Sequence, residues 1–549
     1  MKMDPSGRHP IEGGCVAGDG RTGAAAVSAW APLGITVFRV LWLAQLGSNI
    51  GTWMQTVGAQ WYLVDAAATA TIVALVQTAS LAPSLLLALP AGVFADSFDR
   101  RRLLIGGSIA SGVIALALTA VSLLGWLTPA ILLTFTFLLG AASALTGPAW
   151  QAIQPELVPR EQIPAAAGLG GVTVNGARAI GPALAGFLVA LAGTSVVFGL
   201  NALSFIGAAI ALLWWKRPPQ EGLDDREPFG DALRAGVRYV LAAGLVKRIL
   251  LRSALFALPA SGLWAVLPLI AQRRLGLDSG GYGLLLAALG VGALLGVFVL
   301  PAIRVRISDN AVLVGSALVY GAGSAGAAFL PFGWTLFLLV LTGMAWIGTL
   351  TVLNAALQLT LPQWVRARGA AVYIFVFMGT MAVGSFVWGL VAEALGSGGA
   401  LVVTAIVLLL VAASVALWPL HENTGRIDRS ISLAWPSPTL VFEPGPRDGP
   451  VTIMRSYRVN EAEQAGFVRA MRQVESSRRR TGASRWRLYR SGEEAEVLLE
   501  TFVVPSWSEY RRQRTQRLTG RDREIEEEAY ARASGPADER HYFPPGDEA

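Results

Sequence analysis

Arg178 is the residue of this sequence whose surroundings most directly imply chemistry. It lies more than a dozen positions into an apolar stretch, residues 165–192, that is long enough to cross a lipid bilayer. A guanidinium inside a membrane is costly unless it is paired or faces a water-filled cavity. We therefore expect an anion beside Arg178. A carboxylate of the protein would make the arginine structural, whereas a negatively charged substrate group would make it a binding or gating residue.

Uncharged polar side chains collect in the first apolar stretch and recur in later ones. They are Gln45, Asn49, Gln55 and Gln60, beside Trp53 and Trp61, and then Asn175, Asn201, Asn354 and Gln358. Amides and indoles that face a common cavity would bind a bulky amphipathic solute, because rings stack on indoles and amides hydrogen-bond a polar edge. The alternative is that some of them only bond neighbouring helices or form interfacial aromatic belts.

Acidic side chains are scarce in the apolar stretches. Asp65 ends the first of them, Glu156 lies near the exit of the fourth, and Glu393 lies near the end of the eleventh. If protons are coupled to transport, Asp65 and Glu393 are the expected carriers, because a proton carrier must change its charge within the membrane.

Other kinds of chemistry are excluded by the residues that are missing. The three histidines, His9, His421 and His541, lie outside the apolar stretches, so no histidine relay crosses the membrane. Cys15 is the single cysteine, which leaves no intrachain disulfide and no cysteine-based metal site. No lysine completes a phosphate-binding Gly-x-x-x-x-Gly-Lys-Ser/Thr loop, so ATP is not consumed by that route. We expect secondary transport, with no cofactor and no metal.

The composition indicates the elements that position these residues. The chain has 549 residues, 53% hydrophobic and 15% charged, which is not the balance of a soluble protein. Apolar stretches long enough to span a bilayer recur in two sets of six. The predicted spans are 36–64, 70–95, 103–125, 129–150, 165–192 and 195–215, and then 249–271, 281–303, 310–330, 333–357, 370–395 and 399–420.

The predicted fold is therefore an all-α membrane protein of twelve transmembrane helices in two six-helix pseudo-repeats, followed by a small α+β domain. The predicted segments are an N-terminal tail (1–35), a six-helix bundle (36–215), an amphipathic linker (216–248), a second six-helix bundle (249–420), a linker (421–450) and a C-terminal domain (451–549).

The basic residues predict the orientation in the cell membrane. They concentrate in the loops on one side, for example Arg100 to Arg102, Arg160, Lys216 and Arg366, whereas the other side has essentially only Arg273 and Arg274. By the positive-inside rule the first side, with both termini, is cytoplasmic. Because the basic blocks sit between apolar stretches, the net charge of +7 does not indicate nucleic-acid binding.

The loop after the second span contains Gly92, Asp96, Arg100 and Arg101. A carboxylate at the membrane edge followed by cations can form an ion pair and hold one conformation. The segment resembles the signature Gly-x-x-x-Asp-x-x-x-Arg-Arg loop of the major facilitator superfamily, which also lies between spans two and three. It differs in having Asp99 where many members have glycine. The resemblance implies that these four residues form a conformational latch.

The fifth span is similar to the glycine- and proline-containing motif of superfamily antiporters. Gly181, Pro182 and Gly186 carry this similarity, which implies a hinge or seal between the halves, although ordinary small-residue packing is the alternative. Residues 154–186 and 358–389 also share a basic loop followed by a Gly-rich span. Two such halves suit a design in which a substrate site forms near the midplane between bundles that rock.

The C-terminal residues 451–549 show a β-α-β-β-α-β pattern, with helices expected at about 461–480 and 507–533, typical of a ferredoxin-like domain. The domain looks like dimeric α/β-barrel modules, which implies a homodimer through this region. Residues 36–420 resemble the branch of the superfamily that holds the enterobactin exporter and related drug-efflux proteins. The resemblance implies proton-coupled export of a bulky amphipathic molecule such as a siderophore or drug. The alternatives are nutrient import on the same fold, or a membrane-anchored sensor or enzyme that acts through the C-terminal domain.

Overall fold

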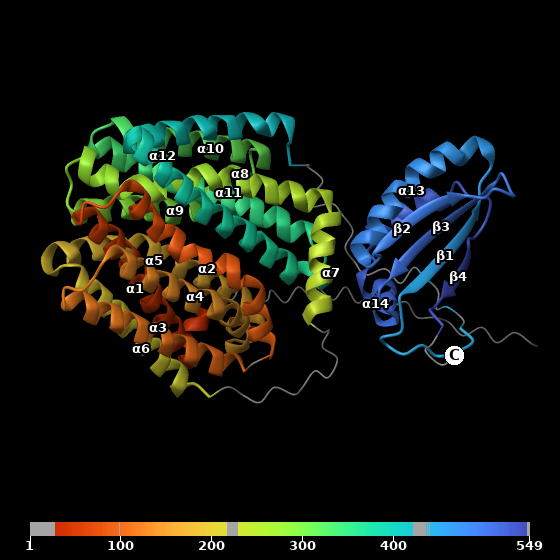
Figure 1. Cartoon of the computed structure of the whole chain (residues 1–549), viewed down its shortest axis with the longest axis horizontal. Helices are drawn as coiled ribbons and strands as arrows, with labels where there is room; N and C mark the ends of the chain where they lie inside the picture. The colour runs from red at the N-terminus through yellow and green to blue at the C-terminus, as the bar shows by residue number, and fades with distance from the viewer. Residues whose placement is uncertain are drawn as a thin grey trace, which may run out of the picture.

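The chain forms a large helical bundle followed by a small sheet domain (Figure 1). The computed structural model describes residues 28–97, 99–216, 229–420, 435, 438 and 440–545, with backbone alone for 88–97, 229–233 and 367. Most of the expected N-terminal tail and much of the two linkers therefore lie outside the described residues. We call residues 440–545 the tail domain.

The bundle consists of two successive groups of long helices separated by one short helix. The first group is α1 (Thr36–Asp65), α2 (Ala70–Ser97), α3 (Arg100–Leu123), α4 (Pro129–Ile153), α5 (Ile163–Ala192) and α6 (Thr194–Trp214). The second group is α8 (Gly244–Leu269), α9 (Ser279–Arg304), α10 (Asp309–Phe329), α11 (Phe332–Thr360) and α12 (Arg366–Leu417). Between them, α7 (Phe229–Ala242) lies across the end of the bundle that faces the tail domain (Figure 1).

Ten of these helices are long and apolar enough to cross a membrane, within the part of the chain that the structure describes. The polar amides of α1 keep it out of that set, although it has 30 residues. The 52 residues of α12 would extend about 78 Å as one straight helix, more than twice a hydrocarbon core. It breaks instead at Gly396, whose φ of 75° favours glycine. The protein is thus a multi-pass membrane protein, while the number twelve stays a prediction.

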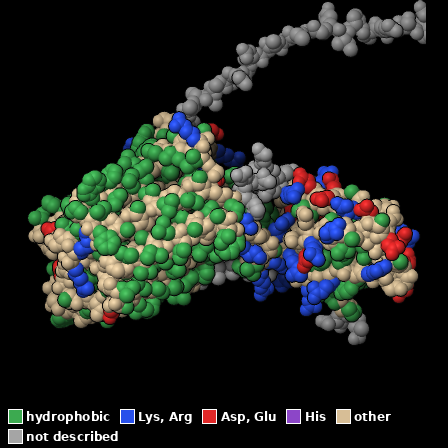
Figure 2. All heavy atoms as spheres, turned by 90° about the horizontal axis from the view of Figure 1, so that it is seen from above, with side chains coloured by type: hydrophobic (Ala, Val, Ile, Leu, Met, Phe, Trp, Pro, Cys, Tyr) green, Lys and Arg blue, Asp and Glu red, His purple; other side chains and the backbone are tan. Residues whose placement is uncertain are grey.

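The surface of the bundle fits this environment. Figure 2 shows hydrophobic side chains over most of the visible side of the bundle, whereas charged side chains gather on the tail domain and at the ends of the bundle. Exposed leucine, valine and phenylalanine side chains, such as Phe298, Leu191 and Leu410, contribute to the apolar exterior. In water such a surface would be unfavourable, and in lipid it is the expected one.

The tail domain contains a four-stranded antiparallel sheet in the order β2-β3-β1-β4. Its elements are β1 (Val451–Arg458), α13 (Glu461–Thr481), β2 (Arg485–Arg490), β3 (Val497–Val504), α14 (Trp507–Arg512), α15 (Gly520–Tyr530) and β4 (Asp538–Tyr542). The sequence predicts one helix over 507–533, but the structure has two. The reason is a capping box, in which Thr519 and Asp522 bond each other's backbone and so begin a new helix.

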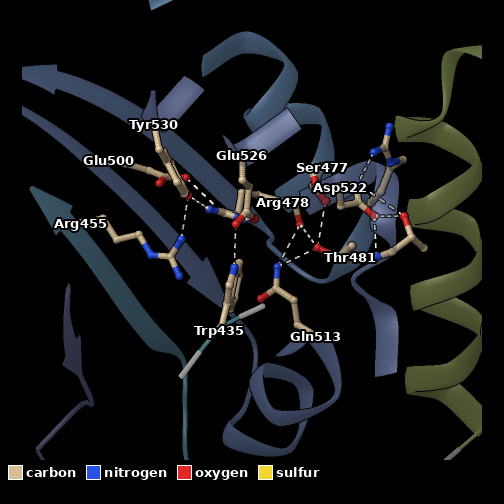
Figure 3. A network of polar contacts seen from close by, with 12 residues as sticks. Trp435, Arg455, Ser477, Arg478, Thr481, Glu500, Gln513, Asp522, Glu526 and Tyr530 are labelled. Carbon is tan, nitrogen blue, oxygen red and sulfur yellow. Dashed lines mark hydrogen bonds and ion pairs between the residues drawn. The ribbon is translucent and has the colours of Figure 1, made fainter. Parts of the chain in front are cut away.

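A network of buried charges fills the space between the sheet and the helices (Figure 3). Arg478 is fully buried and contacts Glu500 at 3.1 Å, and it also pairs with Glu526. Trp435 donates its indole N–H to Glu526 at 2.8 Å. Burial alone would raise the pKa of Glu500, but Arg478 and Arg455 hold that pKa below the ordinary glutamate value. The core of this domain therefore depends on charge pairing as well as on apolar packing.

The tail domain contacts the bundle through α7 and the turn between α11 and α12. Glu509 accepts a hydrogen bond from Arg238 of α7 at 3.3 Å, and its two carboxylate oxygens also accept from Arg517 at 2.8 Å each. The Arg517 guanidinium lies over the ring of Trp364, 4.9 Å from its centroid. Tyr239 of α7 packs edge-on against the same ring. One carboxylate thus links the tail domain to the membrane part.

We predict that Arg478→Met destabilises the tail domain by about 3–5 kcal/mol, because it leaves Glu500 and Glu526 buried without their main cation. Hydrogen exchange of the tail amides in the full chain measures this effect. Arg458→Met is the matched control, since the Arg458–Glu494 pair is exposed and contributes little. Equal protection in both variants would contradict the prediction.

The same network predicts acid sensitivity. Because the folded pKa of Glu500 is lowered, its contribution to stability is present above the unfolded glutamate pKa of about 4.3 and is lost as pH falls through the folded value. Lowering the pH should therefore reduce the hydrogen-exchange protection of the tail-domain amides in the wild type.

Candidate functional site

A cavity of about 460 Å³ lies inside the first group of helices. Its walls come from α1, α2, α3, α4 and α6, and Met378 of α12 is the described contribution from the second group. None of the described lining residues carries a formal charge. The lining combines amides, hydroxyls, two tryptophans and aliphatic side chains, which suits an uncharged polar face and an apolar face of one solute.

Five of the residues predicted from sequence line this cavity: Gln45, Asn49, Trp53, Gln55 and Asn201. Gln45 donates to the Oδ1 of Asn49 at 2.9 Å. Asn201 is buried and donates to the Oε1 of Gln55 at 3.4 Å. Most of these side chains belong to α1. The apolarity of this helix is low because one of its faces lines the cavity.

Sequence reasoning missed the hydroxyl groups of the lining. They are Ser48, Thr52, Thr56, Ser80, Ser84, Ser108, Ser111, Thr136, Ser143 and Thr146. Several bond the carbonyl of the preceding helical turn, as Thr136 does with Leu132 at 2.8 Å and Thr146 with Ala142 at 2.9 Å. In any apolar helix the hydroxyl group of a serine or threonine can donate a hydrogen bond to a carbonyl of its own helix. The presence of these residues in the sequence therefore does not reveal which of them face a cavity.

The other predicted amides and Trp61 lie elsewhere, since Gln60, Trp61, Asn175, Asn354 and Gln358 are not wall residues of the cavity. Gln60 is buried outside the cavity, where its Oε1 accepts from the Tyr282 hydroxyl at 2.6 Å. Asn175 and Asn354 donate to carbonyls of their own helices, Gly171 and Leu350, both at 3.0 Å.

Arg178 lies at the middle of α5, next to the cavity wall. Its guanidinium lies over the ring of Trp53, with the central carbon 5.6 Å from the ring centroid. The Nε and Nη1 atoms are buried, and within the described residues neither has a hydrogen-bond partner. The expected carboxylate of the protein is therefore not found among the described side chains, and the guanidinium is held by an aromatic face instead.

Gly181, Pro182 and Gly186 lie where three helices meet. A Cβ at Gly181 would lie 2.6 Å from the Cβ of Trp53 on α1, and a Cβ at Gly186 would lie 2.4 Å from the carbonyl oxygen of Ser279 on α9. Ser279 donates its hydroxyl to the Gly186 carbonyl at 3.1 Å. Gly186 therefore allows close backbone approach between the two groups of helices, and Gly181 allows it between α1 and α5 within the first group.

The structure describes part of the predicted latch. Arg100 pairs with Glu156 at 2.7 Å, which joins the start of α3 to the 3-10 turn that follows α4. Arg101 donates to the carbonyls of Leu212 and Leu213 at the end of α6, at 3.0 and 2.8 Å. The side chains of Gly92 and Asp96 lie outside the described residues.

The two predicted proton carriers lie at the bundle end away from the tail domain, which we call the far end. Asp65 is the exposed last residue of α1. Glu393 of α12 is exposed and accepts a hydrogen bond from Thr71 of α2, which joins the two helical groups. Neither lines the cavity. The described residues also contain no cluster of three or more His, Cys, Asp or Glu side chains that would hold a metal.

Known proteins with similar sequences are transporters. The staphyloferrin A transporter of Staphylococcus aureus (strain NCTC 8325 / PS 47) is 23% identical over 282 residues, which cover 51% of this chain and 70% of that protein. The enterobactin exporter EntS of Salmonella choleraesuis (strain SC-B67) is 29% identical over 282 residues. That match covers 50% of this chain and 64% of the exporter, less than two thirds of its length.

Solved structures show the same fold. A mutant of the nucleoside transporter NupG superposes with a TM-score of 0.59 at 13% identity, over 70% of this chain and 99% of NupG. An inward-facing bacterial homologue of the human lysosomal transporter Spinster superposes with a TM-score of 0.57 at 17% identity. That match covers 71% of this chain and 96% of the homologue. A family model described as transmembrane secretion effector matches residues 27–543. The chain therefore belongs to the transmembrane secretion effector family and is a membrane transporter of the major facilitator superfamily.

Proposed function

We propose that this protein is a secondary active exporter that moves a bulky amphipathic small molecule, such as a siderophore or drug, by alternating access. The cavity of about 460 Å³ carries the proposal, because its walls are membrane helices that supply uncharged polar and aromatic side chains. The names of the relatives, a staphyloferrin A transporter and an enterobactin exporter, support a siderophore-like solute.

The contacts between the two helical groups support alternating access. Near the far end, Gln60 accepts from Tyr282, Thr71 donates to Glu393, and Arg273 donates to the Ala68 carbonyl. These bonds hold the far end closed, whereas the cavity lies in the half of the first group nearer the tail domain. We propose that the far end is extracellular, that both termini are cytoplasmic, and that transport breaks these bonds.

The export proposal is tested in everted membrane vesicles. With protons as the driving ion, addition of the transported siderophore or dye should dissipate an imposed proton gradient. Asn49→Leu removes a cavity amide and should raise the apparent KM roughly fivefold to tenfold, the value of one lost hydrogen bond. Asn354→Leu is the matched control, because Asn354 bonds only its own helix, and it should change KM less than about twofold.

The outcome of this assay separates the alternatives. Solute uptake into intact cells without efflux would favour an importer. A phenotype that disappears on deletion of residues 451–549 while solute flux persists would favour a function of the tail domain.

We propose Glu393 as the proton carrier and Asp65 as the weaker candidate. Glu393 supports this role because its carboxylate bonds Thr71 across the two helical groups, so protonation would weaken a contact that closes the far end. Glu393→Gln should abolish proton flux but preserve exchange of labelled for unlabelled solute, and Asp65→Asn should leave both intact. Proton flux that persists in Glu393→Gln would contradict this assignment.

We also propose that the tail domain forms a homodimer through the sheet face away from its helices. Met454, Leu499 and Val503 are half-buried on that face, and Tyr489 and Tyr542 are exposed there. Leu499→Glu should convert a dimer of the full chain to a monomer in detergent, as measured by light scattering. Val468→Glu, on the exposed side of α13, should leave the dimer intact. A monomeric wild type would contradict the proposal.

A further inference from the structure

We infer that Arg178 and Trp53 form a subsite for the acidic group of an aromatic acid, so that the transported molecule carries a carboxylate or phenolate on a planar ring. The inference rests on the proposed function, because it concerns a solute that occupies the same cavity. It deepens that proposal by assigning a chemical class to the part of the solute that reaches α5.

The first argument is the missing acceptor. Two nitrogen atoms of Arg178 are buried and have no hydrogen-bond partner among the described residues. The carboxylates described in the long helices do not supply one, since Glu393 bonds Thr71, Asp309 pairs with Arg304, and Asp65 is exposed at the end of α1. A cation held only by an aromatic face is stabilised less than a paired one. An anion that arrives from outside the chain would supply the partner that the described residues lack.

The second argument is the route by which an anion would reach Arg178. The Trp53 side chain belongs to the cavity wall and also lies under the Arg178 guanidinium. A Cβ at Gly181 would lie 2.6 Å from the Cβ of Trp53, so the backbones of α1 and α5 are in close contact at this point and separating them would break that packing. Rotation of the indole about its side-chain bonds is the smaller movement. Such a rotation would expose the guanidinium to a solute in the cavity.

The third argument is the aromatic surroundings. The ring centroids of Trp53 and Trp264 lie 5.7 Å apart. The centroid of Trp346 lies 6.0 Å from that of Trp264 and 6.2 Å from that of Tyr320. The indole Nε1 of Trp346 is buried without an acceptor in the described structure. These three rings are buried behind Trp53 and are not wall residues of the cavity, so movement of Trp53 would bring a solute to an aromatic face and a free indole donor. A planar ring that bears an anionic oxygen matches both features, whereas an aliphatic acid matches only the donors.

Direct binding to the purified full chain tests the inference without requiring transport. The probes are benzoate, its neutral isostere benzamide, and the non-aromatic acid cyclohexanecarboxylate, each measured by equilibrium dialysis with radiolabelled compound. We expect the wild type to bind benzoate at least tenfold more tightly than either other probe. Arg178→Gln should lose this preference by reducing benzoate affinity at least tenfold, while Arg178→Lys should retain part of it and benzamide binding should be unchanged.

Two outcomes would overturn the inference. One is a wild type that binds benzoate no better than benzamide, which needs no variant and so does not depend on how Arg178→Gln folds. The other is a folded Arg178→Gln chain that retains benzoate affinity. Arg274→Gln is the matched arginine control, because Arg274 bonds the Ala327 carbonyl at the far end, and its benzoate affinity should be unchanged.

The same experiment separates this inference from the proposed function. If the chain binds benzoate through Arg178 but does not dissipate a proton gradient, the export proposal is contradicted and the inference of an anion subsite is supported. A chain that exports solute with no charge preference in binding would contradict the subsite and keep export.

Discussion

A polar group inside a lipid bilayer must find its partner within the protein, because no water is present to replace it. Most of this molecule obeys that constraint locally. Thr136 and Thr146 bond their own helices, and Gln60 bonds Tyr282 across the two helical groups. Arg178 departs from it, since two of its buried nitrogens have no described partner. Buried uncharged atoms such as the indole nitrogen of Trp346 also lack a described partner. An unpartnered charge costs more than an unpartnered neutral group, so Arg178 marks the place where a ligand would contribute most.

The same constraint explains why glycine is concentrated at the seam between the helical groups. Without a hydrophobic driving force between helices in lipid, association depends on close packing and on interhelical hydrogen bonds. Gly186 and Gly283 let α5 approach α9 so closely that a Cβ at Gly283 would lie 2.5 Å from the Pro182 carbonyl oxygen. Such an interface has few side chains to repack when it moves. Close glycine contacts and a small number of hydrogen bonds, such as that of Ser279 with Gly186, are therefore compatible with a seam that opens.

The sequence predicted the long elements well because their signal is strong and continuous. The fifth span was expected at 165–192 and α5 is Ile163–Ala192, and the first tail helix was expected at about 461–480 and α13 is Glu461–Thr481. The faces of the helices were harder to predict. A membrane helix is apolar on most sides, so its periodicity does not say whether Asn201 or Asn354 turns to a cavity. Asn201 reaches the wall and Asn354 bonds Leu350 instead, a difference that only the packing of neighbouring helices decides.

The position of the tail domain also follows from packing rather than from sequence pattern. Glu509 bonds Arg238 of α7, and Arg517 stacks on Trp364 beside α12, so the described contacts attach the tail to the linker helix and to the second helical group. Burial alone would raise the pKa of Glu509, but Arg517 and Arg238 keep it below the ordinary glutamate value, so the contact stays charged near neutral pH. In a transporter whose halves rock, a domain attached in this way would travel with the second half. Its free sheet face would then change position relative to the first half in every cycle, and a dimer formed through that face would couple the movements of two chains.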